Sequence, residues 1–239
     1  MKRNVALSLL VLLPFAISAV AQCGGCYFYG GDFDPNNPNA NALANETDAI
    51  IGGEPYGAAT YQNFVLTNGG GWGPLGFFTN DMSSLNPTSV YWELRSGVSE
   101  GNGGTLLLSG TATGNAFINT PTGRSGFGYT EYTYGVTDLD IFLPDGVYWF
   151  AVVPNDPNSN GRSFNSNTFG LNSVGTEISN EQYFNSAFFG ADFTNANNEG
   201  VYPTFSSGAY AWIPEPSSLI MFGCGLVAAA GVVRRRLSR

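Results

Sequence analysis

Carboxylates are the residues through which this chain could do chemistry. Its 239 residues include no histidine, and its one lysine, Lys2, lies in the N-terminal leader. Serine and cysteine nucleophiles need a neighbouring base, usually His or Lys, and zinc sites need His or Cys ligands. A pair of carboxylates acting on a glycosidic bond stays open, but no spacing singles out such a pair. We therefore predict a protein that is not an enzyme, with a two-carboxylate glycoside hydrolase as the less favoured alternative.

Two oxygen-rich stretches have the composition of calcium loops. Asp32, Asp34 and Asn36 follow the 1, 3, 5 spacing of such a loop, but Asn37 replaces the expected glycine and Leu43 the closing glutamate. The second stretch comprises Asp192, Asn195, Asn197 and Glu199. Asx turns in solvated loops are the favoured explanation of both stretches and calcium binding is the alternative, so we predict no metal site and no cofactor.

The cysteines predict one local cross-link. Cys23 and Cys26 form a C-x-x-C pair near the N-terminus, and Cys224 lies in an apolar segment. In an oxidising compartment the first two are expected to form a disulfide. A redox role is the alternative, but it needs a helix N-terminus and a βαβ context that the sequence does not indicate.

Aromatic residues could either build a core or stack against sugars. Trp92 and Trp149 fall in candidate strands, so we assign them to the core. Trp72 lies on a glycine-rich turn and is the better candidate for surface contact, although packing is favoured there too.

These residues must be positioned by strands. Short alternating segments recur between Gly, Asn and Pro, which is typical of an all-β sandwich. The candidate strands are 61–67, 89–95, 104–109, 128–136, 138–143 and 147–153, with a further pair around 183–193. Segment 147–153 is apolar on both faces and therefore predicted to be central. We expect a loop over 155–180 and a tether over 200–209.

The strand-forming region, residues 22–212, is strongly acidic. It carries 17 acidic residues against Arg95, Arg124 and Arg162, a net charge of −14. Nucleic acid binding needs clustered Lys and Arg, so it is excluded.

The N-terminus predicts export. Lys2 and Arg3 precede an apolar stretch, and small residues follow it, a pattern that indicates a signal peptide over residues 1–21. Signal peptidase is expected to cut between Ala21 and Gln22. A lipoprotein anchored through Cys23 is the alternative, although Gln22 suits that processing poorly.

The C-terminus predicts a membrane anchor. Pro214-Glu215-Pro216 should stay extended, because each proline disfavours helix in the residue before it. Residues 217–233 are uncharged and just long enough for one transmembrane helix. Arg234, Arg235 and Arg236 would hold that end on the cytoplasmic side.

This tail resembles the PEP-CTERM sorting signal of Gram-negative bacteria, here residues 213–239. Segments 30–39, 91–97 and 146–149 look like pieces of extracellular domains that carry the same tail. The resemblance implies a jelly-roll-like ectodomain that is exported through the inner membrane. The C-terminal helix would hold it in that membrane until the protease exosortase processes it. It further implies placement at the cell surface or in the matrix, as a structural or adhesive component associated with exopolysaccharide. A carbohydrate-binding module is the alternative.

Overall fold

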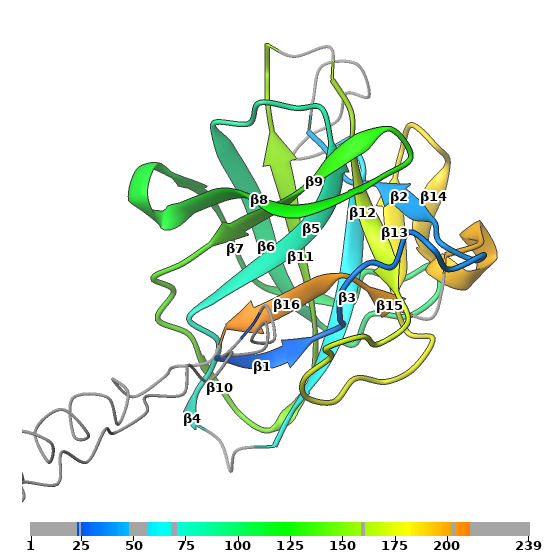
Figure 1. The fold of residues 1–239 in the computed structure, drawn as a ribbon. Helices are drawn as coiled ribbons and strands as arrows, with labels where there is room; N and C mark the ends of the chain where they lie inside the picture. Colours follow the sequence, from blue (N-terminus) through cyan, green and yellow to red (C-terminus); the bar gives the residue numbers. More distant parts are fainter. Residues whose placement is uncertain are drawn as a thin grey trace, which may run out of the picture.

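The described part of the chain folds into extended strands. The computed structural model describes residues 23, 25–47, 57–67, 71–158, 161–201 and 204–210. These residues form an eight-stranded sheet, a six-stranded sheet and a two-stranded ribbon. The two large sheets lie face to face, with the eight-stranded one nearer the viewer in Figure 1. The prediction of an all-β protein is confirmed, and the two layers fit a β-sandwich.

The eight-stranded sheet is organised around β5, which pairs with three other strands. Its main path runs β1-β16-β5-β12-β15, while β9 also pairs with β5, β8 with β9, and β2 with β12. Its members are β1 (Cys26–Tyr29), β2 (Ala42–Ala44), β5 (Gly76–Ser83), β8 (Phe117–Gly126), β9 (Tyr129–Val136), β12 (Ser163–Thr168), β15 (Thr204–Phe205) and β16 (Ser207–Tyr210).

The six-stranded sheet runs in the order β14-β13-β3-β11-β6-β7. Its members are β3 (Ala59–Leu66), β6 (Ser89–Ser96), β7 (Thr105–Thr113), β11 (Gly146–Asn155), β13 (Tyr183–Ser186) and β14 (Ala191–Asn195). Strand β11 pairs with β3 on one side and β6 on the other, so the predicted central position of segment 147–153 is confirmed. The remaining elements are β4 (Gly71–Trp72), β10 (Phe142–Leu143) and the 3-10 helices η1 (Gly114–Ala116) and η2 (Ala196–Glu199).

Aromatic rings fill the apolar half of the space between the sheets. Phe77 of β5 stacks on Phe150 of β11 with ring centroids 4.9 Å apart, and Phe64 of β3 packs beside them. Trp92 joins this cluster and Trp149 lies on the other face of β11, both buried as predicted. Each such ring removes about 150–250 Å² from water, so this cluster holds the two layers together.

The other half of the interior is polar. Asp81 of β5 is fully buried and accepts hydrogen bonds from Asn45 Nδ2 at 2.9 Å, Thr79 Oγ1 at 2.6 Å and Ser163 Oγ at 2.8 Å. Beside this group, Asn165 Nδ2 donates to Thr60 across the gap between the sheets and to Ser207 within its own sheet. Buried polar groups are tolerated when they are paired in this way.

This polar interior explains two corrections to the expected strands. Strand β5 was not expected, because Thr79, Asp81 and Ser83 occupy its inward positions and remove the apolar alternation that marks a strand. Strand β12 lies inside the expected loop 155–180 for the same reason, since its sequence Ser-Phe-Asn-Ser-Asn-Thr is typical of a solvated loop but is almost entirely buried.

The expected tether 200–209 and the expected strand 138–143 also differ from the structure. Segment 200–209 is not a tether, because it contains β15 and most of β16, and β16 pairs with both β1 and β5. The expected strand 138–143 shrinks to β10, because Leu139 and Ile141 pack against the core from irregular backbone. In both cases tertiary contacts outweigh local sequence preference.

Candidate functional site

Several predicted functional residues lie outside the described residues. These are the cleavage position Ala21 and Gln22, the motif Pro214, Glu215 and Pro216, the helix 217–233 and the arginines Arg234, Arg235 and Arg236. Within the described ranges no helix is long and apolar enough to cross a membrane. The side chain of Trp72 is likewise outside the description, although its backbone pairs with Phe142.

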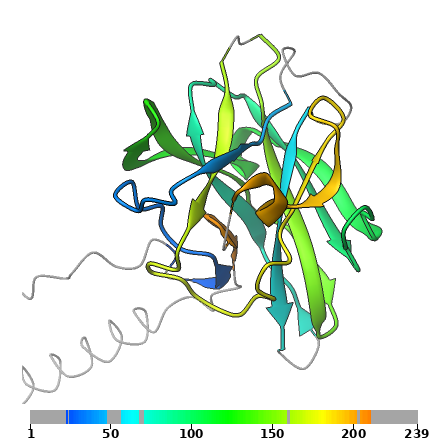
Figure 2. The same cartoon turned by 90° about the vertical axis from the view of Figure 1, so that its right-hand side faces the viewer.

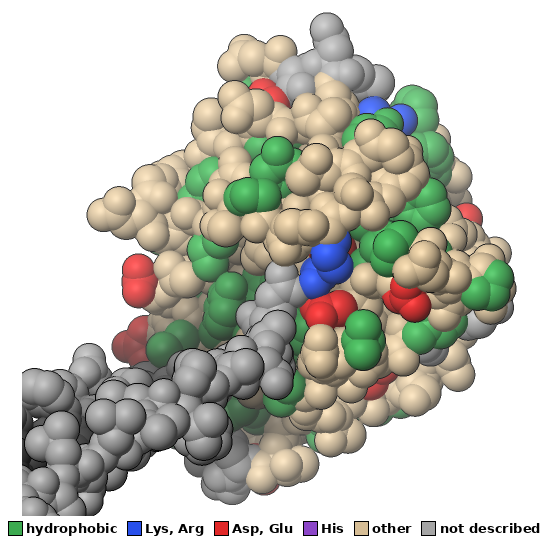
Figure 3. All heavy atoms as spheres, in the orientation of Figure 1, with side chains coloured by type: hydrophobic (Ala, Val, Ile, Leu, Met, Phe, Trp, Pro, Cys, Tyr) green, Lys and Arg blue, Asp and Glu red, His purple; other side chains and the backbone are tan. Residues whose placement is uncertain are grey.

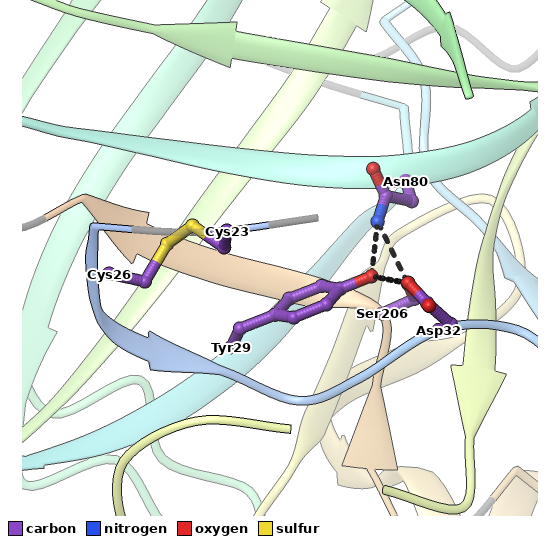
Figure 4. Close-up of a disulfide and its surroundings, with 6 residues drawn as sticks. All are labelled: Cys23, Cys26, Tyr29, Asp32, Asn80 and Ser206. Atoms are coloured by element: carbon purple, nitrogen blue, oxygen red, sulfur yellow. Dashed lines mark hydrogen bonds between the residues drawn. A yellow bond between two sulfur atoms is a disulfide. The ribbon is translucent and has the colours of Figure 1, made fainter. Parts of the chain in front are cut away.

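The N-terminal cysteines are joined in the structure. Cys23 and Cys26 form a disulfide with Cα atoms 5.6 Å apart, at the start of β1 (Figure 4). Cys23 and Cys26 pack with Tyr29 and Phe78 in a small cluster on the outer face of the eight-stranded sheet. The cross-link therefore fixes the entry of the chain into the sandwich.

Both carboxylate oxygens of Asp32 accept hydrogen bonds from other side chains of the protein. Its Oδ1 accepts from Tyr29 OH at 2.6 Å and from Arg124 Nη1 at 2.7 Å, and its Oδ2 accepts from Asn172 Nδ2 at 2.6 Å. Figure 4 shows the Tyr29 hydroxyl between Asp32, Asn80 and Ser206, all linked by hydrogen bonds. This network joins the segment after β1 to β5 and to the residue before β16.

Two other side chains of the oxygen-rich stretches bond to nearby backbone. Asp34 Oδ1 accepts from the backbone N–H of Asn36 at 2.9 Å, and Asn195 Oδ1 caps η2 by accepting from Asn197 N–H at 3.0 Å. The described residues contain no group of three acidic or cysteine side chains placed to hold a metal ion. The local bonds are those of Asx turns.

Each arginine of the described residues is paired with a buried glutamate. Arg95 lies 2.9 Å from Glu93, Arg162 lies 2.6 Å from Glu46, and Arg124 bridges Glu131 and Asp32. These glutamates are almost inaccessible to solvent, so their charges are compensated inside the protein. On the face drawn in Figure 3, basic side chains accordingly form only small blue patches, and the central patch borders acidic side chains in red.

Glu177 is a carboxylate with a different environment, inside a surface pocket. Its Oε2 accepts hydrogen bonds from Gln62 Nε2 at 2.6 Å, Thr204 Oγ1 at 2.6 Å and Gln182 Nε2 at 3.0 Å. All three donors are neutral and buried, and none of the described hydrogen bonds ends on Oε1. Burial raises the pKa of the Glu177 carboxyl, an effect that these hydrogen bonds partly offset.

The cavity around this carboxylate, named here the Glu177 pocket, has a volume of about 260 Å³. It is formed where segment 169–180, yellow in Figure 2, runs alongside β1 and is held by paired backbone hydrogen bonds between Tyr29 and Val174. Its lining comprises Phe28, Tyr29, Gly30, Phe169, Gly170, Ser173, Val174, Gly175, Glu177, Ser179 and Thr204.

The lining of the Glu177 pocket suits a small hydroxyl-rich ligand. Phe169 is 38 % exposed and offers a ring, Ser173 and Ser179 offer hydroxyls, and Glu177 offers an acceptor oxygen. Glu177 is the single acid of the lining, whereas glycoside hydrolysis needs two carboxyl groups about 5–10 Å apart. The pocket lining therefore supplies groups that can bind a small ligand, and it lacks the two carboxyl groups of a glycoside hydrolase.

A second concave feature is an aromatic groove of about 180 Å³ on the outer face of the eight-stranded sheet. It is lined by Asn41, Ala42, Phe127, Tyr129 and Phe164. Phe127 is 55 % exposed at the tip of the β8–β9 hairpin and has a φ of 56°, which few non-glycine residues adopt. Tyr129 and Phe164 pack with ring centroids 5.6 Å apart, and Arg162 lies over Phe164.

Sequence reasoning missed both concave features. The donors to Glu177 come from β3, from β15 and from the residue before β13, so no local motif could bring them together. For Phe127 the sequence offers one weak indication of an exposed turn position, because Gly126 and Gly128 flank the aromatic residue.

The chain was compared with family models, curated proteins and solved structures. No family model, no curated protein and no solved structure matches the chain.

Proposed function

We propose that this chain is an exported, surface-directed protein without enzymatic activity that binds glycan in an extracellular polysaccharide matrix. Its C-terminal sequence carries the sorting part of the proposal. This tail resembles the sorting signal that exosortase recognises. It consists of Pro214-Glu215-Pro216, the apolar run 217–233 and Arg234 to Arg236. The β-sandwich is then a jelly-roll-like ectodomain, followed by one transmembrane helix that anchors it until processing.

The Glu177 pocket carries the glycan-binding part. A half-buried acceptor, flanking hydroxyls and an exposed ring form the mixed polar and apolar lining through which proteins orient small polar ligands. At about 260 Å³ the pocket lies just below the roughly 300–1,000 Å³ of drug-sized sites, so it matches about one sugar ring. The aromatic groove around Phe127 is a further surface against which a sugar could stack.

Sorting is tested in the native host. Changing Pro214, Glu215 and Pro216 together to alanine should leave the chain at its unprocessed size in the inner membrane, because the extended protease substrate is lost. The control is Ser217→Ala/Ser218→Ala, which alters the next two residues and keeps the tripeptide. Immunoblots of membrane and surface fractions give the readout, and unchanged processing of the tripeptide variant would overturn the sorting proposal.

Glycan binding is tested with the purified chain and exopolysaccharide from the host by isothermal titration calorimetry. Glu177→Gln should weaken binding about tenfold or more, since a hydrogen bond to a charged group contributes about 1.5–3 kcal/mol. The matched control is Glu199→Gln, which removes one charge from an exposed position.

Two results would contradict the binding proposal. One is absence of binding by the unaltered chain, and the other is a Glu177→Gln variant that binds as tightly as the control. Release of reducing sugar from the same polysaccharide would instead establish the two-carboxylate hydrolase.

A further inference from the structure

The outer side of β7 is an open sheet edge. Strand β7 ends the six-stranded sheet and pairs with β6 from Thr105 opposite Ser96 to Thr113 opposite Ser89. Among the described residues, none forms a backbone hydrogen bond to its other side. Such an edge presents a row of unpaired N–H and C=O groups that another strand can match.

The other strand edges of the fold carry features that discourage pairing. Strand β8 contains Pro121 and Arg124, with an irregular register between Pro121 and Ser125. Strands β1 and β14 are four and five residues long and are also irregular, and β15 has two residues. These are the usual means of blunting an edge.

Strand β7 has little such protection. It is nine residues long and contains no proline and no charged residue. Its register shifts once, beside Leu107, and is then regular over six residues from Leu108 to Thr113. Of the edge strands in the described structure, β7 is therefore the one most suited to a partner strand.

The exposed side chains of β7 are apolar as well. Leu106, Leu107 and Leu108 are 46 %, 38 % and 42 % exposed. Leu107 and Leu108 continue into a groove of about 590 Å³ beside Phe142, which is 72 % exposed. Three consecutive exposed leucines on an open edge favour association with another surface.

Charge indicates that the partner is a second copy. Residues 22–212 have a net charge of −14, so two copies repel each other across most of their surfaces. No charged residue lies between Glu100 and Arg124, and this stretch contains the whole of β7. Strand β7 of another copy offers the same uncharged, apolar edge, and an antiparallel pair related by a two-fold axis closes without leaving an open end.

We propose that two copies of this chain pair antiparallel along β7, joining their six-stranded sheets into one continuous sheet. Main-chain hydrogen bonds over 108–113 hold the pair together with the two-fold axis close to Thr111, and the leucines of each copy lie against the far end of the partner's β7. This goes beyond glycan binding, because a dimer presents two Glu177 pockets to one polymer and so raises its avidity.

The test compares one substitution on two strands. Thr111 of β7 and Thr120 of β8 are both exposed, and each is changed to lysine in the full chain purified in mild detergent. Sedimentation velocity over a range of concentrations gives the dissociation constant, and circular dichroism checks the fold. The unaltered chain and Thr120→Lys should form dimers, and Thr111→Lys should dissociate at least tenfold more readily because two lysines meet across the axis.

Both substitutions lower the net negative charge equally, so a general charge effect would act on both. The proposal is overturned if the unaltered chain is monomeric throughout, if Thr111→Lys leaves the dissociation constant unchanged, or if Thr120→Lys weakens the dimer as much. Ser109→Lys, at another exposed position of β7, replaces Thr111→Lys if that variant does not fold.

Discussion

The buried carboxyl of Asp81 should make the stability of this protein depend on pH between about pH 4 and pH 7. Asp81 is fully buried between the sheets and receives hydrogen bonds from Thr79, Asn45 and Ser163, with no arginine bonded to it. Burial raises the pKa of the Asp81 carboxyl from 3.8 to about 7, although these hydrogen bonds oppose the rise. The substitution that removes this titration with little change of shape is Asp81→Asn.

The sign and size of this pH dependence follow from the pKa of the Asp81 carboxyl in the folded and unfolded states. The folded state binds the proton more tightly than the unfolded state, so the free energy of unfolding falls as pH rises from about 4 to about 7 and then levels off. Each pH unit within that range corresponds to about 1.4 kcal/mol. The unaltered protein should therefore be roughly 3 kcal/mol more stable at pH 5 than at pH 8, with a smaller contribution of the same sign from Glu177.

Urea denaturation at pH 5, 6, 7 and 8 measures this difference for the unaltered chain, for Asp81→Asn and for the exposed control Asp140→Asn. The control should retain the slope, and Asp81→Asn should lose most of it. If the unaltered protein gains stability from pH 5 to pH 8, or if Asp81→Asn keeps the full slope, the carboxyl does not titrate as argued.

Two other substitutions test the ion pairs and the cross-link. Arg124→Met should destabilise the fold by about 3–5 kcal/mol, because it leaves Glu131 buried without its cation, and Arg124→Met/Glu131→Leu should recover part of the loss in the same denaturation assay. A double variant no more stable than the single one would contradict this explanation. Cys23→Ser/Cys26→Ser should lower the unfolding free energy by about 2 kcal/mol, since a four-residue loop constrains the unfolded chain little. Cys224→Ser is the control expected to change nothing, and a loss well above 2 kcal/mol would show that the disulfide does more than close that loop.

Sequence alone determined the class of the fold and its apolar centre. Short strand-forming segments between turn residues are a local property, so they located β3, β6, β7, β9 and β11. The same pattern placed Trp92 and Trp149 in the core. The absence of histidine, and of lysine after Lys2, likewise limits the chemistry open to this protein, because composition does not depend on how the chain folds.

Only the tertiary structure decided which polar residues are buried. Asp81 and Ser163 have the side chains of solvent-facing residues, yet each becomes acceptable inside the protein because partners distant in the chain satisfy it. For that reason β5 and β12 escaped prediction, and so did the Glu177 pocket, whose three donors lie between 5 and 115 residues from the carboxylate. A single sequence records hydrophobic burial through its periodicity, whereas polar burial depends on which distant groups the fold brings within hydrogen-bonding distance.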